Sequence, residues 1–106
     1  MDLAVEVYKI IKLLPKEELY NLSDQIRRAA VSIPSNIAEG NQRNTTKDYV
    51  NFLYIAKGSN AELKTQLLLC QRLDYLTYDE IKPSVELCDE PGKMLNSLIN
   101  KLKPSI

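Results

Sequence analysis

The sequence predicts an all-α protein that folds as an antiparallel up-down four-helix bundle. Apolar residues recur at helical spacing along almost the whole chain, and no run alternates with the period of two that a half-buried strand requires. Four such stretches follow one another with short connections, which favours antiparallel packing of neighbouring helices. Because 44% of the 106 residues are hydrophobic, the chain can fill one core, and we expect residues 1–106 to form a single domain.

The first predicted helix has an unusually broad apolar surface. It carries two neighbouring stripes, one formed by Leu3, Val7, Ile10 and Leu14 and the other by Ala4, Tyr8 and Ile11. Such a surface exceeds what a small bundle buries internally, so it predicts contact with another copy of the chain. Pro15 disfavours helix at the residue before it and ends the segment, and residues 16–20 are expected to form a short turn.

The second predicted helix runs to Gly40, with Ser23 as its expected N-cap. Its buried face is marked by apolar residues at helical spacing from Ile26 to Ile37. Pro34 lies inside this pattern, where proline removes a backbone hydrogen bond and crowds the preceding turn. We expect a kink there rather than a break, because the apolar face continues on both sides of the proline.

The third predicted helix is the longest and extends to about Tyr75. Thr45 and Asp48 resemble a capping box at its start. Gly58 and Ser59 interrupt its middle, and a pair of small residues at this point predicts the close approach of another helix.

The fourth predicted helix begins at a capping box formed by Thr77 and Glu80, and its apolar stripe extends from Ile81 to Leu102. Pro83 and the pair Pro91–Gly92 fall inside it and are expected to bend or interrupt it.

The composition argues against most catalysts. The chain has no His, which removes the side chain that most often performs acid–base or metal chemistry near neutral pH. Cys70 and Cys88 belong to no Cys-x-x-Cys pair and are predicted to be reduced core residues. We therefore expect no cofactor, no metal and no catalytic site.

Charge and hydropathy restrict the partners. Fourteen Lys and Arg residues balance fourteen Asp and Glu residues, so the formal net charge is zero and implies no bulk attraction to nucleic acid or to an anionic membrane. No apolar run is long enough for a membrane span or a secretory signal. We expect a soluble, cytoplasmic protein that does not bind membranes.

A polar stripe on the second helix is the first candidate site. It is formed by Arg28, Ser32, Ser35 and Glu39, with Asn36 beside it. Three interpretations are open: a solvated face, a buried or interfacial polar network, and a phosphate-binding patch. Arg28 and Glu39 are about 16 Å apart along the helix axis. We therefore expect each to pair with another helix or with a neighbouring subunit, and the alternative is a small enzyme that holds both in a cleft.

Basic side chains along the second and third helices are the second candidate site. These candidate nucleic-acid contacts are Arg27, Arg43, Lys47, Lys57 and Lys64. Aromatic residues between them are few, so the strip predicts weak, electrostatic binding.

Three blocks of the sequence resemble a known family. The block from residue 25 to residue 40 reads QIRRAAVSIPSNIAEG, which is similar to the signature of four-helix-bundle proteins encoded in 23S rRNA intervening sequences. The other two blocks resemble further conserved segments of these proteins and comprise residues 52–59 with 61–63 and 65–67, and residues 93–95 with 98–99 and Leu102. The departures are Pro83 and Pro91–Gly92, where the family usually runs as unbroken helix.

The resemblance implies an up-down bundle that assembles as a ring-like homopentamer and has no known enzymatic activity. The same family includes the accessory variability proteins of diversity-generating retroelements, which bind nucleic acid and a partner reverse transcriptase. The zero net charge separates this chain from the strongly nucleic-acid-binding members. We expect a non-catalytic oligomeric scaffold or accessory protein whose candidate partners are itself, RNA and a reverse transcriptase.

Overall fold

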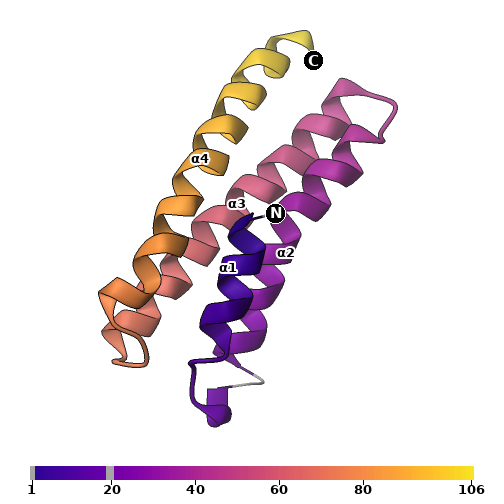
Figure 1. Ribbon diagram of the computed structural model, residues 1–106. Coiled ribbons are helices and arrows are strands. Elements are labelled where there is room, and N and C mark those ends of the chain that lie inside the picture. Colours follow the sequence, from indigo (N-terminus) through magenta and orange to yellow (C-terminus); the bar gives the residue numbers. More distant parts are fainter. Residues whose placement is uncertain (1, 19–20) are drawn as a thin grey trace.

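All regular secondary structure in the part that the computed structural model describes, residues 2–18 and 21–106, is helical (Figure 1). Its four α-helices are α1 (Asp2–Ile11), α2 (Leu22–Asn41), α3 (Thr46–Arg72) and α4 (Tyr78–Leu102). Short 3-10 helices cover Lys16–Glu18 and Lys103–Ser105. No strand occurs among the described residues, so the prediction of an all-α four-helix bundle is confirmed. Two residues of the expected 16–20 turn, 19 and 20, lie outside the described part.

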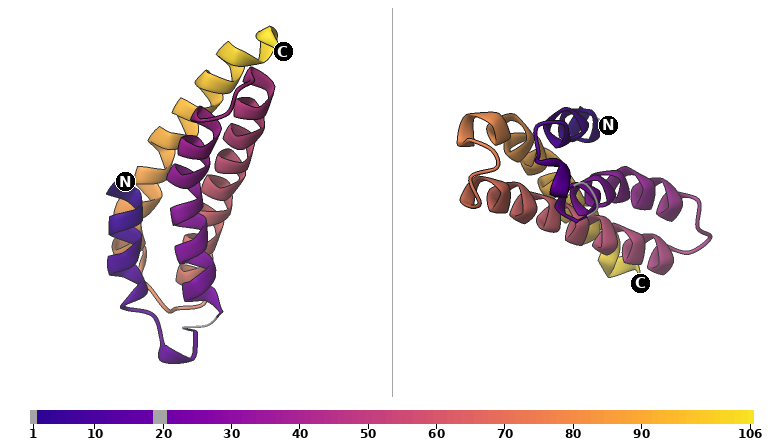
Figure 2. Two further views of the ribbon diagram at one scale, coloured as in Figure 1. Left: turned by 90° about the vertical axis from the view of Figure 1, so that its right-hand side faces the viewer. Right: turned by 90° about the horizontal axis from the view of Figure 1, so that it is seen from below.

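The helices pack around a long α2–α3 pair. α4 packs against α3, and α1 lies across α2 and α4 (Figure 2). α1 has 10 residues, whereas α2, α3 and α4 have 20, 27 and 25. The 10 residues of α1 span about 15 Å, whereas the molecule is 45 Å long. The bundle therefore has four helices at one end and three at the other.

The core follows the same division. The larger cluster of buried apolar residues lies at the four-helix end and includes Val7 of α1, Ile26 of α2 and Leu67 of α3. The smaller cluster joins α3 and α4 at the three-helix end and includes Leu53 and Leu95. Ile37 of α2 packs against both clusters and links them.

The two stripes of α1 are buried to different degrees. The stripe from Leu3 to Leu14 is buried completely. In the second stripe Ile11 is buried and Ala4 is half-buried, while Tyr8 keeps 43% of its surface exposed. The bundle thus covers more of α1 than expected, and the apolar surface left over consists of Tyr8 with its neighbour Val5.

The N-terminal ends of α3 and α4 follow the local capping signals, and the N-terminal end of α2 departs from them. Thr45 Oγ1 accepts a hydrogen bond from the Asp48 amide at 3.1 Å, and Thr77 and Glu80 form the expected reciprocal capping box. Ser23 is not the N-cap of α2, because the helix begins at Leu22 without a side-chain cap. Ser23 lies three residues before Ile26 on the buried face, so its side chain points into the core.

The α3 helix ends at Arg72, three residues before its expected end near Tyr75. Asp74 adopts a left-handed backbone conformation with a φ of 61°. The amide of Tyr75 then donates to the carbonyl of Cys70 at 3.0 Å, and the amide of Asp74 donates to that of Gln71 at 3.0 Å. This is the Schellman arrangement, with aspartate in place of the usual glycine.

The prolines do not break the helices. α2 continues through Pro34, and α4 continues through both Pro83 and Pro91. The expected interruption of α4 is therefore absent. Each proline removes one backbone donor, and the buried residues on either side keep the helix in place against its neighbours.

Close helix approach depends on Gly40 rather than on Gly58. A Cβ atom at Gly40 would lie 2.7 Å from Phe52 Cβ and 2.9 Å from Tyr49 Cδ1, so only glycine fits where α2 meets α3. A Cβ at Gly58 would meet no atom within 4 Å, because this residue faces outward. The expectation of close packing at Gly58 is wrong within the chain, while Ser59 does face α2.

The two glycines therefore predict opposite effects of the same change. Gly40→Ala should lower the free energy of unfolding by about 1–3 kcal/mol through overpacking. Gly58→Ala should raise it by about 0.5–1 kcal/mol, since alanine is the better helix former and nothing obstructs its methyl group. Urea denaturation of the two variants measures both, and a stabilising Gly40→Ala would contradict the close contact.

Candidate functional site

The polar stripe of α2 forms a hydrogen-bonded link to α3. The hydroxyl groups of Ser32 and Ser59 are 2.9 Å apart. Asn36 Nδ2 donates to both the hydroxyl and the carbonyl oxygen of Ser32, each at 2.7 Å. These side chains are partly buried, which corresponds to a polar network for Ser32 and Asn36. Ser35 is exposed and lies outside the network.

Ser59 is the member of this network that the stripe on α2 does not reveal. In the sequence it appears only as a small residue beside Gly58. Its role depends on the register between α2 and α3, which brings together residues 27 positions apart.

Arg28 and Glu39 find their partners within a few residues along the chain, Arg28 on α2 itself and Glu39 just beyond its end. Arg28 Nε lies 3.0 Å from Asp24 Oδ2, and the same carboxylate holds Arg27 at 3.0 Å. Glu39 Oε1 lies 2.8 Å from Arg43 Nη2. This differs from the expected pairing with another helix, because carboxylate and guanidinium four residues apart already meet on a helix surface. Arg28 is also 79% exposed, so it is not a buried charge.

Two open hollows border the polar stripe. One, of about 500 Å³, lies beside α1 and α2 and is lined by Tyr8, Arg27, Arg28, Val31, Ser32, Ser35 and Asn36. The other, of about 240 Å³, lies beside α2 and α3 and includes Arg28, Ser59 and Glu62. Glu39 borders neither hollow, so the structure does not bring Arg28 and Glu39 into a common cleft.

The five basic candidates are spread over several places. Arg27 lines the hollow beside α1. Arg43 stacks on Phe52, with its guanidinium carbon 4.8 Å from the ring centre, and Lys47 is exposed at the start of α3. Lys57 and Lys64 are the two that the fold brings together, in a groove between α3 and α4.

Both cysteines are buried and reduced, as the sequence predicts. Cys88 is 1% exposed, and burial raises the pKa of its thiol from 9.0 to about 11. The ammonium of Lys64 opposes this rise and the carboxylate of Asp89 adds to it. Within the described residues, no three His, Cys, Asp or Glu side chains gather to hold a metal ion.

No helix in residues 2–18 and 21–106 has the length and apolar character needed to cross a membrane.

The chain belongs to the 23S rRNA-intervening sequence protein family, whose model matches residues 1–97. It is also similar to the crystal structure of a protein of unknown function from the S23 ribosomal protein family of Bacteroides thetaiotaomicron VPI-5482. The two chains are 30% identical, the match covers 92% of each, and the TM-score is 0.84. No curated protein sequence matches.

The exposed setting of Arg28 predicts a small effect of its removal. Arg28→Ala should lower the free energy of unfolding by about 0.5 kcal/mol or less, because the exposed pair with Asp24 is screened by water. Leu53→Ala, which empties a fully buried site, should cost about 2–5 kcal/mol and serves as the control. A loss near 3 kcal/mol in Arg28→Ala would indicate a buried pairing that the chain alone does not show.

The raised pKa of Cys88 predicts a loss of stability at high pH. Its contribution is fully present below pH 9, where the thiol is protonated in both the folded and the unfolded chain. Between about pH 9 and about pH 11 only the unfolded chain ionises, so the free energy of unfolding falls by up to about 1.4 kcal/mol per pH unit. Denaturation of Cys88→Ala in parallel isolates this term, and identical pH profiles would contradict it.

Proposed function

We propose that this member of the 23S rRNA-intervening sequence protein family is a non-catalytic scaffold that assembles into a ring of identical subunits and presents the ring to RNA. Two exposed apolar surfaces on different sides of the bundle carry the proposal. A monomer gains nothing from exposing them, whereas a pair of complementary surfaces allows each subunit to bind the next.

The first surface, here called the α1 face, consists of Val5 and Tyr8 of α1 and Val31 of α2. All three side chains are exposed. Tyr8 and Val31 also line the hollow of about 500 Å³, so the α1 face combines a protruding aromatic ring with a depression beside it. Tyrosine in such a place is a frequent anchor of protein interfaces.

The second surface, here called the α3 face, runs along the outside of α3. It consists of Tyr54 and Ile55 at one end and Leu68 and Leu69 at the other, with Gly58 and Ala61 between them. The large side chains are exposed, and a Cβ at Gly58 would meet open space. Small residues between large ones leave a shallow depression that another helix can enter.

The arrangement of the helices supports a ring rather than a symmetric dimer. α1 and α3 both pack on α2 and α4, and in the end-on view of Figure 2 they lie on different sides of the molecule. Contact between the α1 face of one subunit and the α3 face of the next is heterologous, and a heterologous contact closes into a ring when the rotation permits. The family resemblance implies five subunits.

The surroundings of Arg28 and Glu39 support a non-catalytic role. Each is exposed and held by a partner four residues away in the sequence, which is the setting of ordinary surface ion pairs. A catalytic pair would need a shared, partly dehydrated cleft that perturbs its pKa values. RNA is proposed as the partner because the groove at Lys57 and Lys64 offers positive charge, and a reverse transcriptase is the alternative that the family resemblance implies.

The ring predicts a mass of about 60 kDa (5 × 12.1) in multi-angle light scattering at micromolar concentration. Gly58→Trp should reduce it to about 12 kDa, because the monomer has open space at this residue but a subunit on the α3 face would clash. Ser97→Trp, at an exposed residue of α4, is the matched control and should keep the ring. A wild-type mass of 12 kDa would refute the assembly.

The head-to-tail arrangement has a sharper test. Gly58→Trp keeps its α1 face, and Tyr8→Lys keeps its α3 face, so each should be monomeric alone. An equal mixture should form a dimer of about 24 kDa (2 × 12.1) and nothing larger. If the mixture stays monomeric, the two faces do not bind each other.

A further inference from the structure

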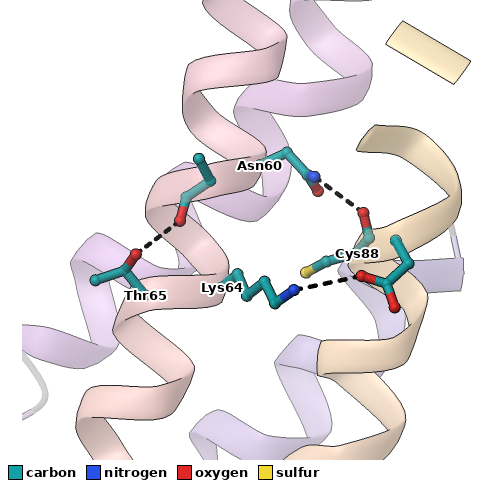
Figure 3. Close-up of polar contacts among 6 residues, drawn as sticks. Asn60, Lys64, Thr65 and Cys88 are labelled. Carbon is teal, nitrogen blue, oxygen red and sulfur yellow. Dashed lines mark hydrogen bonds and ion pairs between the residues drawn. The ribbon is translucent and has the colours of Figure 1, made fainter. Parts of the chain in front are cut away.

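The groove between α3 and α4 collects polar side chains that neither helix would gather alone. It has a volume of about 320 Å³. α3 contributes Lys57, Asn60 and Lys64 to it, and α4 contributes Asp89, Lys93 and Asn96. Figure 3 shows part of this arrangement, with the polar ends of Asn60 and Lys64 directed toward α4.

The groove is positively charged although the chain is neutral overall. Lys64 Nζ lies 3.4 Å from Asp89 Oδ1, so these two charges offset each other. Lys57 and Lys93 form no ion pair with any carboxylate of the described residues. Two ammonium groups therefore face the same groove without a counter-ion, which is a setting that attracts an anion.

The floor of the groove holds a buried acceptor that lacks a donor. Asn60 is 8% exposed, and its Nδ2 donates to the carbonyl oxygen of Cys88 at 2.9 Å (Figure 3). Its Oδ1 is buried and accepts no hydrogen bond within the described protein. Such atoms are rare in folded proteins, because burying an acceptor without a partner costs free energy. Asn60 Oδ1 therefore lacks a hydrogen-bond donor, and the ammonium groups of Lys57 and Lys93 lack an anion.

Gly92 leaves room for the Asn60 amide on the side of α4. A Cβ at this position would lie 3.2 Å from Asn60 Nδ2, tighter than ordinary contact. Any larger residue at this position would press on the amide that lines the groove.

We propose that this groove binds the ribose–phosphate backbone of RNA. Lys57 and Lys93 pair with the non-bridging oxygens of a phosphate. Asn60 Oδ1 is closed to solvent in the free protein, and in the complex the amide rotates so that the ribose 2′-hydroxyl next to that phosphate donates to it. A phosphodiester alone has no donor to offer, whereas the 2′-hydroxyl is both donor and acceptor. The site specifies the RNA contact of the proposed function and rests on that function, but it does not depend on the number of subunits.

The test measures the affinity of a 20-nucleotide single-stranded RNA and of the DNA of the same sequence by fluorescence polarisation over a range of salt concentrations. Wild type should bind RNA at least about threefold more tightly than DNA, because DNA lacks the 2′-hydroxyl. The double variant Lys57→Gln/Lys93→Gln should bind RNA about tenfold more weakly at low salt, and its log–log salt slope should be shallower by about 0.7 for each groove that holds a phosphate.

The matched control is Lys101→Gln/Lys103→Gln, which removes the same charge outside the groove and should change affinity less than twofold. Gly92→Ala changes no charge and should reduce the preference for RNA over DNA while circular dichroism and oligomer mass stay unchanged. Equal effects of the two double variants would show that RNA does not bind in this groove, although the protein would still bind RNA. Absence of RNA binding by the wild type at low salt would overturn the groove together with the RNA partner, and light scattering would still decide the ring.

Discussion

The close contact between α2 and α3 is the constraint on which the rest of the structure depends. It is the most extensive contact in the bundle, and the two helices can meet only because Gly40 leaves room for Phe52 and Tyr49. Further along the pair, Ser32 and Ser59 join the helices through their hydroxyl groups. Small residues occupy these two points of the interface, while larger apolar residues of both helices, among them Ile26 and Leu67, share the main core cluster.

The lengths and positions of the helices explain why a small protein exposes so much apolar surface. α1 is too short to cover the whole groove between α2 and α4, and no helix among the described residues covers the outside of α3. The exposed Tyr8 and Ile55 therefore lie on helices whose inward-facing apolar side chains are already packed in the core. Surfaces of this kind are typical of subunit contacts, because burying them between copies removes apolar surface from water.

The fold could be predicted from the sequence because its signals are local. Helical periodicity and the caps at Thr45 and Thr77 involve residues within one or two turns of each other, and the structure confirms them. The expectations that the structure contradicts concern contacts between helices. Whether Gly58 faces a neighbour, and which atoms Ser59 reaches, depends on how α3 is rotated about its axis, and periodicity fixes that rotation only to within a residue. The partner of Arg28 differs from the expected one for the opposite reason, because Asp24, one turn away on the same helix, already meets its guanidinium.

A formal net charge of zero describes the sum of the charges and not their positions. Residues 74–90 hold six acids against Lys82 alone, whereas residues 93–106 hold three lysines and no acid. Because α4 packs along α3, the point at which α4 becomes basic comes to lie beside Lys57 and Lys64. Positive potential therefore arises where two helices meet, which no sum along the chain reveals. In the proposed ring every subunit repeats this groove, and a strand that contacts several grooves gains affinity from each. Assembly would repeat the same local positive charge around the ring, so a neutral subunit and an RNA-binding ring are compatible.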